Sequence, residues 1–312
     1  MSIYLVTGGA GFIGSHIVEE LVKRGESVRV LDNFMTGKRE NLQPFFDDID
    51  LIEGDIRDMA LCRKAVNGVD YVLHQAALPS VPRSVENPVL THEINATGTL
   101  NLLTAAKDEG VKAFVFASSS SVYGADTRMP KVEGEEGTLL SPYAVSKMTG
   151  EKYCQVFHEL FDFNAICLRY FNVFGPRQDP TSQYAAAVPL FITRMMDGRP
   201  PIIYGDGAQS RDFTYVKNIV HANLLAAQSS GAGGEIMNTA CHGQITVNTL
   251  VETIKTKLGV TNLKSIYEPP RPGDIKHSFA DISKARRLIA YEPIVSFDKG
   301  LENTINWYKH HS

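Results

Sequence analysis

The sequence predicts an α/β protein built on a doubly wound parallel sheet, followed by a smaller α/β region. In the first half, short β-branched runs alternate with longer segments of helical hydrophobic spacing, an order typical of a parallel sheet covered by helices on both faces. After about residue 172, prolines and glycines divide the chain into shorter segments. The length of 312 residues, with 43% hydrophobic and 21% charged residues, suits about two domains of a globular protein.

The predicted elements follow this alternation in order. Buried strands are expected at 3–7, 27–31, 51–53, 71–74 and 113–117, and helices at 11–24, 92–109, 184–196, 216–228, 247–258 and 298–308. No linker, repeat or low-complexity segment separates the halves. We therefore predict a sheet domain at 1–172 and a second region at 173–312 that is partly interleaved with it.

Composition and charge exclude several classes of protein. A net charge of −4 gives no general affinity for nucleic acid or an anionic membrane. The four cysteines are scattered without a CxxC or Cys/His cluster, so we expect no metal site and a reducing, cytoplasmic compartment. The longest apolar run, 185–192, is too short to span a bilayer, and the chain enters its first strand without a targeting segment.

A glycine-rich loop lies between the first strand and the first helix. Gly8, Gly11 and Gly14 have the GxxGxxG spacing that lets a pyrophosphate approach the backbone N–H groups at a helix start. Asp32 ends the second strand, where a carboxylate accepts hydrogen bonds from an adenosine ribose, although a simple Asp-Asn turn is the alternative. The pattern predicts a dinucleotide site and favours NAD over NADP, while Lys38 and Arg39 leave a 2′-phosphate possible.

A run of serines and a Tyr-Lys pair supply the candidate catalytic groups. Residues 118–121 are four serines directly after the fifth predicted strand. Tyr143 and Lys147 follow Pro142 and share one helix face at i and i+4. A lysine ammonium beside a phenol is expected to lower the pKa of the phenol and make it a usable base. Turn-capping serines and a surface Tyr-Lys pair are the alternatives.

Taken together in this order, these motifs resemble the extended short-chain dehydrogenase/reductase family, and among it the nucleotide-sugar 4-epimerases. The resemblance covers essentially the whole chain. Its motifs are TGGAGFIGS at 7–15, LDN at 31–33, GDIR at 54–57, HQAA at 74–77, NATGT at 95–99, the serine run, Tyr143 with Lys147, and RYFNVFGP at 169–176.

The resemblance implies a Rossmann sheet domain that binds NAD, and roles for matched residues. Tyr143 would be the base, Lys147 would tune it and hold the nicotinamide ribose, and Ser119 would assist, with Ser120 and Ser121 as close substitutes. The implied cofactor-binding residues are Gly8, Gly11, Phe12, Ile13, Asp32, Asn33, Thr36, Gly37, Asp55, Ile56, Gln75, Ala76, Ala77, Asn95, Tyr143, Lys147 and Tyr170.

The same resemblance implies a UDP-sugar site in the second region. Arg211 and Arg271 would grip the diphosphate and Asp274 would accept from ribose hydroxyls, chemistry that suits arginine forks and carboxylates. Surface charge without a partner is the alternative for each arginine. The implied substrate-binding residues are Ser80, Ser119, Ser120, Asn172, Ala187, Val188, Tyr204, Arg211, Arg271, Asp274 and Ser278.

Departures from related branches narrow the expected substrate. The 4,6-dehydratases carry an Asp-Glu pair where this chain has Ser120 and Ser121, so dehydration is disfavoured. The segment 178–186 differs from the RPDMAF-like segment of uronate enzymes and is similar to the group acting on N-acetylated UDP-sugars. Ser278 stands where galactose-restricted epimerases have a bulky tyrosine, which leaves room for a 2-acetamido group.

The resemblance implies reversible C4 epimerisation of a UDP-hexose through a 4-keto sugar. UDP-GlcNAc/UDP-GalNAc is the expected pair, with UDP-Glc/UDP-Gal as a further activity. A nucleotide-sugar 4-reductase or dehydrogenase, a UDP-glucuronate 4-epimerase and a non-catalytic NAD-binding protein are the alternatives. The resemblance also implies a homodimer packed through the helices at 92–109 and 143–161.

Overall fold

The protein, described by a computed structural model over residues 1–180, 186–270 and 276–311, is centred on a parallel sheet. Within these residues the sheet has seven strands, and each neighbouring pair is parallel. Their order across the sheet is β3 (Ile49–Glu53), β2 (Ser27–Asp32), β1 (Ile3–Thr7), β4 (Tyr71–His74), β5 (Ala113–Ser119), β6 (Ala165–Tyr170) and β11 (Ile236–Thr239). The strands run outward from β1 in both directions, which confirms the predicted Rossmann fold.

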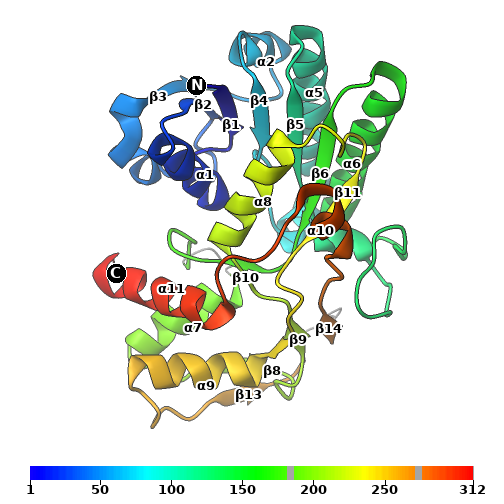
Figure 1. Cartoon of the computed structure of the whole chain (residues 1–312). Helices are drawn as coiled ribbons and strands as arrows, with labels where there is room; N and C mark the ends of the chain where they lie inside the picture. Colours follow the sequence, from blue (N-terminus) through cyan, green and yellow to red (C-terminus); the bar gives the residue numbers. More distant parts are fainter. Residues whose placement is uncertain (181–185, 271–275, 312) are drawn as a thin grey trace.

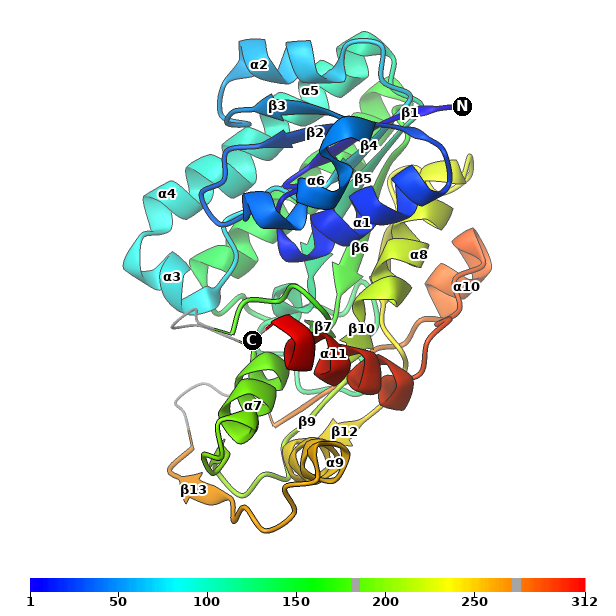
Figure 2. The same ribbon diagram turned by 90° about the vertical axis from the view of Figure 1, so that its left-hand side faces the viewer.

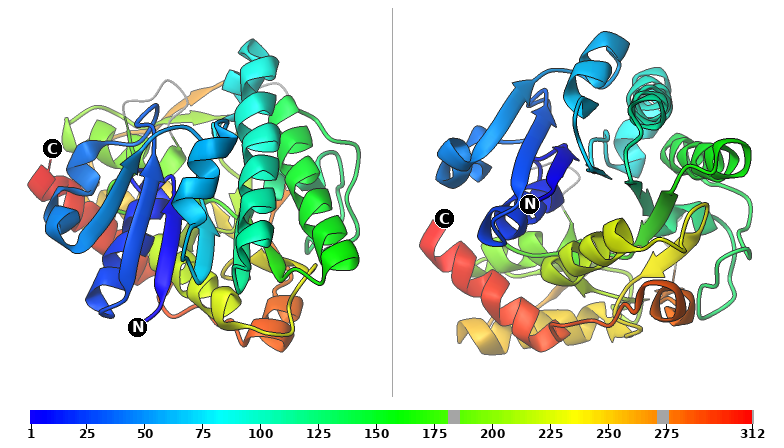
Figure 3. Two further views of the ribbon diagram at one scale, coloured as in Figure 1. Left: turned by 90° about the horizontal axis from the view of Figure 1, so that it is seen from above. Right: turned by 45° about the horizontal axis from the view of Figure 1, so that its top comes forward.

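Helices cover both faces of the sheet, as Figures 1 and 3 show. One face is covered by α1 (Phe12–Lys23) and α8 (Val216–Gln228), which pack against each other, and the other by α2 (Met59–Val66), α5 (Gly98–Glu109) and α6 (Pro142–Phe161). All of β6 and all but the last residue of β5 are buried. Burial on both faces explains why these strands are continuous apolar runs.

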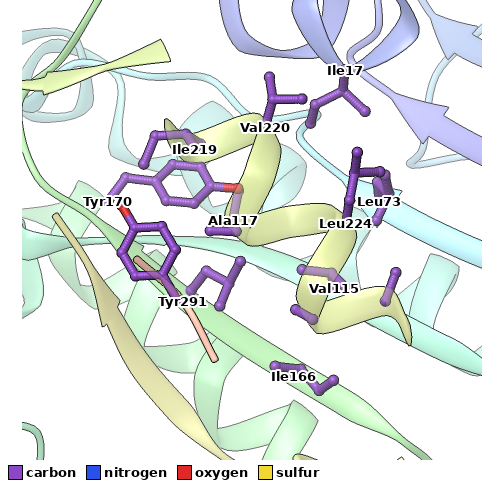
Figure 4. Packing of buried hydrophobic residues seen from close by; sticks show 14 of the residues in the cluster. Ile17, Leu73, Val115, Ala117, Ile166, Tyr170, Ile219, Val220, Leu224 and Tyr291 are labelled. Atoms are coloured by element: carbon purple, nitrogen blue, oxygen red, sulfur yellow. The ribbon is translucent and has the colours of Figure 1, made fainter. Parts of the chain in front are cut away.

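The core on the α1–α8 face joins the two halves of the chain. Ile17 of α1, Val115 of β5 and Leu224 of α8 belong to one buried cluster (Figure 4). Helix α8 therefore covers the sheet of the first half although it lies in the second half of the sequence. Strand β11 likewise pairs with β6. The boundary at residue 172 remains a prediction, and so does the partial interleaving of the two regions.

The smaller region consists of short strands and helices below the sheet (Figure 2). Its own core includes Phe174, Phe191, Tyr215, Leu250 and Ile305. Its paired strands are β7 (Val173–Phe174) with β10 (Thr214–Tyr215), β8 (Ile202–Tyr204) with β13 (Ile266–Glu268), and β9 (Ser210–Arg211) between β12 (Ile245–Thr246) and β14 (His277–Ser278). Its helices are α7 (Ala187–Met196), α9 (Val247–Leu258) and α11 (Phe297–His311), whereas α10 (Ser283–Ile289) packs against β11 and α8 in the core of the sheet.

Most predicted elements are found within a few residues of their expected bounds. The helix predicted at 92–109 is confirmed as a helical segment, which begins earlier with α4 (Pro88–His92) and continues through a π-helical turn (Glu93–Thr97) into α5. Helix α7 is described from Ala187, and residues 184 and 185 of its predicted start lie outside the described residues. The remaining short helices are α3 (Val81–Glu86), η1 (Arg39–Asn41), η2 (Gln43–Asp48) and η4 (Ser120–Tyr123). Across the described ranges, no helix is both long and apolar enough to cross a bilayer.

The glycine loop gives a stability prediction. An alanine Cβ at position 14 would lie 2.1 Å from the Gly8 carbonyl oxygen, a backbone atom that cannot rotate away. We expect Gly14→Ala to lower the free energy of unfolding by about 3 kcal/mol, the upper end for overpacking. This exceeds the roughly 1 kcal/mol that alanine gains over glycine in a helix. Chemical denaturation measures it, with Gly231→Ala as the control because a Cβ there meets nothing within 4 Å. Equal stability of both variants would contradict this packing.

Candidate active site

A cavity of ≈ 780 Å³ opens at the carboxyl ends of the parallel strands. This is where open α/β sheets bind their ligands, because the strand order reverses there. Loops after β1, β2, β3 and β4 and the ends of β5 and β6 all contribute to its wall. Every residue predicted to bind the cofactor lines this cavity except Asn95.

The glycine loop has the shape that a pyrophosphate requires. Gly8 has a φ of +66°, and a Cβ there would lie 2.7 Å from the Ala76 backbone nitrogen. Gly11 is the N-cap of α1 and supplies no side-chain cap. The first-turn N–H groups of α1 therefore face the cavity wall without a competing side-chain acceptor, and with the helix dipole they suit a phosphate. The cradle fits the pyrophosphate of NAD.

Asp32 lines the cavity and also braces the loops around it. Its carboxylate accepts the N–H of Ala10 at 2.9 Å and that of Phe34 at 2.8 Å. Burial raises the pKa of Asp32 despite these two bonds. The loop carrying Thr36 and Gly37 lines the cavity next to it.

Lys38 and Arg39, the two cations considered as ligands for a 2′-phosphate, are each paired with a carboxylate. The Lys38 ammonium lies 3.5 Å from a carboxylate oxygen of Asp179. Arg39 forms an ion pair with Glu53. These two contacts occupy the candidate phosphate-binding groups with carboxylates, so the charges on this side of the cavity fit NAD better than NADP.

The three predicted catalytic residues come together where β5 meets α6. Ser119 ends β5 and hydrogen-bonds the Tyr143 phenol. Tyr143 sits in the first turn of α6, whose N-cap Ser141 accepts the N–H of Ala144 at 3.1 Å. The Lys147 ammonium lies 6.0 Å from the centre of the Tyr143 ring. Tyr143 and Lys147 both line the cavity, whereas Ser118 rather than Ser119 is the serine in its wall.

The electrostatics of this pair differ from the prediction. Burial raises the pKa of Tyr143, and the hydrogen bond with Ser119 offsets only part of that effect. Burial also lowers the pKa of Lys147 to about 8. The expectation that Lys147 lowers the pKa of the phenol is therefore wrong for the described side chains. Lys147 is buried and Tyr143 is half-buried, and the ammonium donates to the Ala117 carbonyl at 2.8 Å instead.

Asn95 lies behind the cavity wall. Its amide oxygen accepts the N–H of Leu78 at 2.7 Å, and its amide nitrogen donates to Ser146 at 3.1 Å. Ser146 in turn donates to the Tyr143 carbonyl at 2.8 Å. The predicted lining role of Asn95 is thus corrected to one of support, because its amide is fully used inside the π-helical turn and its neighbours.

Tyr170 is held at the cavity by a buried amide that the sequence did not reveal. The Asn223 amide donates to the Tyr170 hydroxyl at 2.8 Å, and the Gln75 amide donates to Asn223 at 3.1 Å. Burial raises the pKa of Tyr170 well above its usual range. The one sequence signal for this contact was Asn223 itself, a polar residue within an apolar helix. The sequence did not indicate that α8 packs against the sheet near Tyr170.

The predicted substrate residues extend from the cavity into the smaller region. Ser80 lines the cavity with a φ of +96°, an unusual value for a side-chain-bearing residue. Arg211 and Ser278 face each other in the parallel pairing of β9 and β14. Tyr204 ends β8. Arg271 and Asp274 lie outside the described residues.

The other members of the set occupy turns and a helix start. Asn172 has a φ of +36° two residues after the end of β6, and Ser120 begins η4 after β5. Ala187 opens α7, whereas Val188 is 1% exposed and packs in the core of the smaller region. The Val188 side chain is therefore corrected to a core position, which leaves only its backbone to meet a ligand.

One side of the cavity comes from a segment outside the predicted set. Arg177, Gln178 and Asp179, together with Ala186, line the cavity, and Arg177 lies beside α1. Arg177 has a φ of +64° and forms an ion pair with Glu19 of α1. Its position directly after the RYFNVFGP motif was the available signal. Among the residues that the structure places, no group of three or more His, Cys, Asp or Glu is arranged to hold a metal.

Comparison with known proteins agrees with this geometry. Residues 4–240 match the model of the NAD dependent epimerase/dehydratase family. The chain is 34% identical to the UDP-glucose 4-epimerase of Mycolicibacterium smegmatis, with 99% of each covered. A solved structure of UDP-N-acetylglucosamine 4-epimerase from Methanobrevibacter ruminantium M1, in complex with UDP-N-acetylmuramic acid, is 43% identical with a TM-score of 0.95, covering 100% of this chain and 99% of that one.

A third similar protein is the UDP-glucuronic acid 4-epimerase of Bacillus cereus, solved with UDP-glucuronic acid and NAD. It is 33% identical with a TM-score of 0.90, covering 99% of this chain and 100% of that one. The two solved relatives share the fold of this chain over essentially its whole length. This chain belongs to the NAD dependent epimerase/dehydratase family.

Proposed function

We propose that this enzyme is an NAD-dependent UDP-sugar 4-epimerase that inverts C4 of UDP-GlcNAc/UDP-GalNAc and also acts on UDP-Glc/UDP-Gal. The observation that carries the proposal is the meeting of Ser119, Tyr143 and Lys147 at the end of a dinucleotide cavity. That arrangement holds a proton acceptor at a fixed place beside the cofactor wall, as general base catalysis requires.

Some of these residues would bind the cofactor, and others would transfer the proton. Gly8, Gly11 and Asp32 would hold the dinucleotide, and Lys147 its nicotinamide ribose. NAD supplies hydride chemistry when bound, and the protein supplies orientation and electrostatics. Tyr143 takes the proton of the sugar 4′-hydroxyl and returns it after the sugar has turned over. Ser119 holds the phenol by its hydrogen bond and stabilises the charged form of Tyr143.

The substrate end of the site is proposed from position and chemistry. Arg211, with Arg271 and Asp274, would anchor the UDP moiety while the sugar rotates, and Asn172 and Tyr204 would complete the nucleotide side. Ser278 shares a strand pairing with Arg211, so a small side chain stands close to the anchoring arginine. A small residue there favours a sugar that carries a 2-acetamido group.

Four other functions known or conceivable in this family fit this chain less well. A 4,6-dehydratase needs an acid-base pair where Ser120 and Ser121 stand. A net 4-reductase or dehydrogenase would exchange its cofactor, and a UDP-glucuronate 4-epimerase would prefer a uronate. A non-catalytic NAD-binding protein has no need of the Tyr143–Lys147 pair.

A homodimer and a cytoplasmic location complete the proposal. Helix α6 and the neighbouring α3 and α4 expose apolar side chains to water. Packing against a second copy would bury these side chains, which supports a homodimer. The exposed residues are Val85, Val89, Val145, Val156, Leu160 and Phe161. All four cysteines are free thiols, which suits a reducing compartment.

The central test is incubation with single UDP-sugars followed by separation of the C4 epimers. We expect UDP-GlcNAc and UDP-Glc each to convert to a mixture with its epimer without added cofactor. UDP-GlcA is expected to remain unchanged. Conversion of UDP-GlcA alone would favour the uronate epimerase, and stoichiometric use of added NADH would favour the reductase. No conversion of either hexose contradicts the proposal.

Loss of the phenol gives the second test. We expect Tyr143→Phe to lower the turnover number by about 10²–10⁴-fold, the usual contribution of a positioned acid-base group. Tyr153→Phe on the same helix is the matched control and should leave turnover unchanged. Initial rates with UDP-GlcNAc at saturating concentration measure the effect. Unchanged turnover of Tyr143→Phe would remove Tyr143 from the mechanism.

Pocket size gives the third test. Ser278→Tyr adds a ring beside the strand of Arg211 and should exclude the 2-acetamido group. We expect kcat/KM for UDP-GlcNAc to fall by about 10–200-fold, the range for steric discrimination in a pocket. Activity on UDP-Glc serves as the internal control and should change little. An equal loss on both sugars would show that Ser278 does not set the choice.

A further inference from the structure

Three consecutive residues at the end of β5 contact three successive turns of α6. The Ala117 carbonyl accepts from Lys147 at 2.8 Å, and Ser119 hydrogen-bonds Tyr143. Between them, the Ser118 hydroxyl donates to a carboxylate oxygen of Glu151 at 2.5 Å. Glu151 follows Lys147 by four residues, so it lies on the same helix face one turn further from the cavity.

Glu151 is a fully buried carboxylate, with 0% of its surface exposed. A carboxylate in this position is costly unless it is paired and hydrogen-bonded. Arg169 of β6 provides the pairing, with its Nε at 2.8 Å from Oε1 and an Nη at 2.7 Å from Oε2. The guanidinium is paired on its other side with Glu136 at 2.5 Å, which is 21% exposed.

Pairing with Arg169 does not by itself explain why a carboxylate is buried at position 151. The guanidinium already has Glu136 as a counter-ion, so a second carboxylate is more than its charge requires. Glu151 lies one helical turn after Lys147 on α6, and its negative charge opposes the effect of burial on the pKa of that lysine. It also holds Ser118 in the cavity wall.

The other titratable groups around Lys147 do not replace this charge. From α6 itself Tyr143 faces the lysine, and burial raises its pKa. From β4 His74 faces it, but burial lowers the pKa of His74 to about 3, so the imidazole is neutral. From β6 Cys167 lies beside Glu151, and burial raises the pKa of its thiol well above the usual value. Arg169, also of β6, is a cation held by Glu151.

We infer that Glu151 is a positioning residue of the proposed reaction: it keeps the Lys147 ammonium charged and fixes the strand end that carries Ser118 and Ser119. The inference rests on the proposed function for its catalytic meaning. Its physical content is an electrostatic link between Glu151 and Lys147 that exists whatever the substrate.

The direction of the effect follows from the charge. In Glu151→Gln the negative charge one helical turn from Lys147 is lost, so Lys147 releases its proton at lower pH. The loss of a close opposite charge should move the titration midpoint of Lys147 down by about one pH unit. Activity that needs a charged lysine should then decline at lower pH on the alkaline side of the profile, by the same amount.

The experiment measures the lysine directly as well as the reaction. The ¹³Cε resonance of Lys147, assigned by its absence in Lys147→Met, reports the titration midpoint. The alkaline limb of kcat for UDP-GlcNAc epimerisation reports the consequence. Glu136→Gln is the matched control, because it removes the other carboxylate of the same guanidinium and should leave both values unchanged.

A double variant separates the two roles that Glu151 could have. Glu151→Gln with Arg169→Met removes both buried charges, a replacement that proteins commonly tolerate. We expect the lower midpoint of Lys147 to persist in it. A midpoint equal to wild type in Glu151→Gln, or one restored by the double variant, overturns the inference. Absence of epimerisation by the wild-type enzyme instead contradicts the proposed function and leaves the resonance shift to be judged by itself.

Discussion

The site depends on the packing of one strand end against one helix. A backbone carbonyl and two serine hydroxyls of β5 meet a lysine, a glutamate and a tyrosine of α6. This contact requires α6 to approach the sheet closely, and Gly150 permits it. A Cβ at that position would lie 2.4 Å from the Phe116 ring. Catalytic geometry is thus set by core packing, which has the rigidity of a close-packed interior.

Local sequence patterns were sufficient to predict the sheet and most residues that line the cofactor cavity. The glycine spacing, Asp32 and the Tyr143–Lys147 pair are short-range signals, and each is placed by an element that its own sequence specifies. The order of these elements along the chain then fixes the strand order, because crossovers between parallel strands are right-handed and short. The family resemblance added the roles that no spacing could supply.

Features that depend on contacts between distant parts of the chain could not be predicted from the sequence. The pKa directions of Tyr143 and Lys147 follow from burial, and burial is set by elements far along the chain. Asn223 reaches Tyr170 only because α8 lies across the sheet. The π-helical turn at 93–97 lies within a stretch that the pattern predicts as one regular helix, and its Asn95 amide is bonded to the distant Leu78 backbone.

The position of α8 and β11 has a consequence for synthesis of the chain. When residues 1–172 have left the ribosome, β6 still has an unpaired edge and one face of the sheet lacks its helical cover. An open parallel edge beside an apolar face is a surface prone to aggregation. The edge of β6 is paired in the nascent chain only after β11, at residues 236–239, has emerged. Co-translational folding of this enzyme is therefore governed by a segment that follows its catalytic residues by about ninety positions.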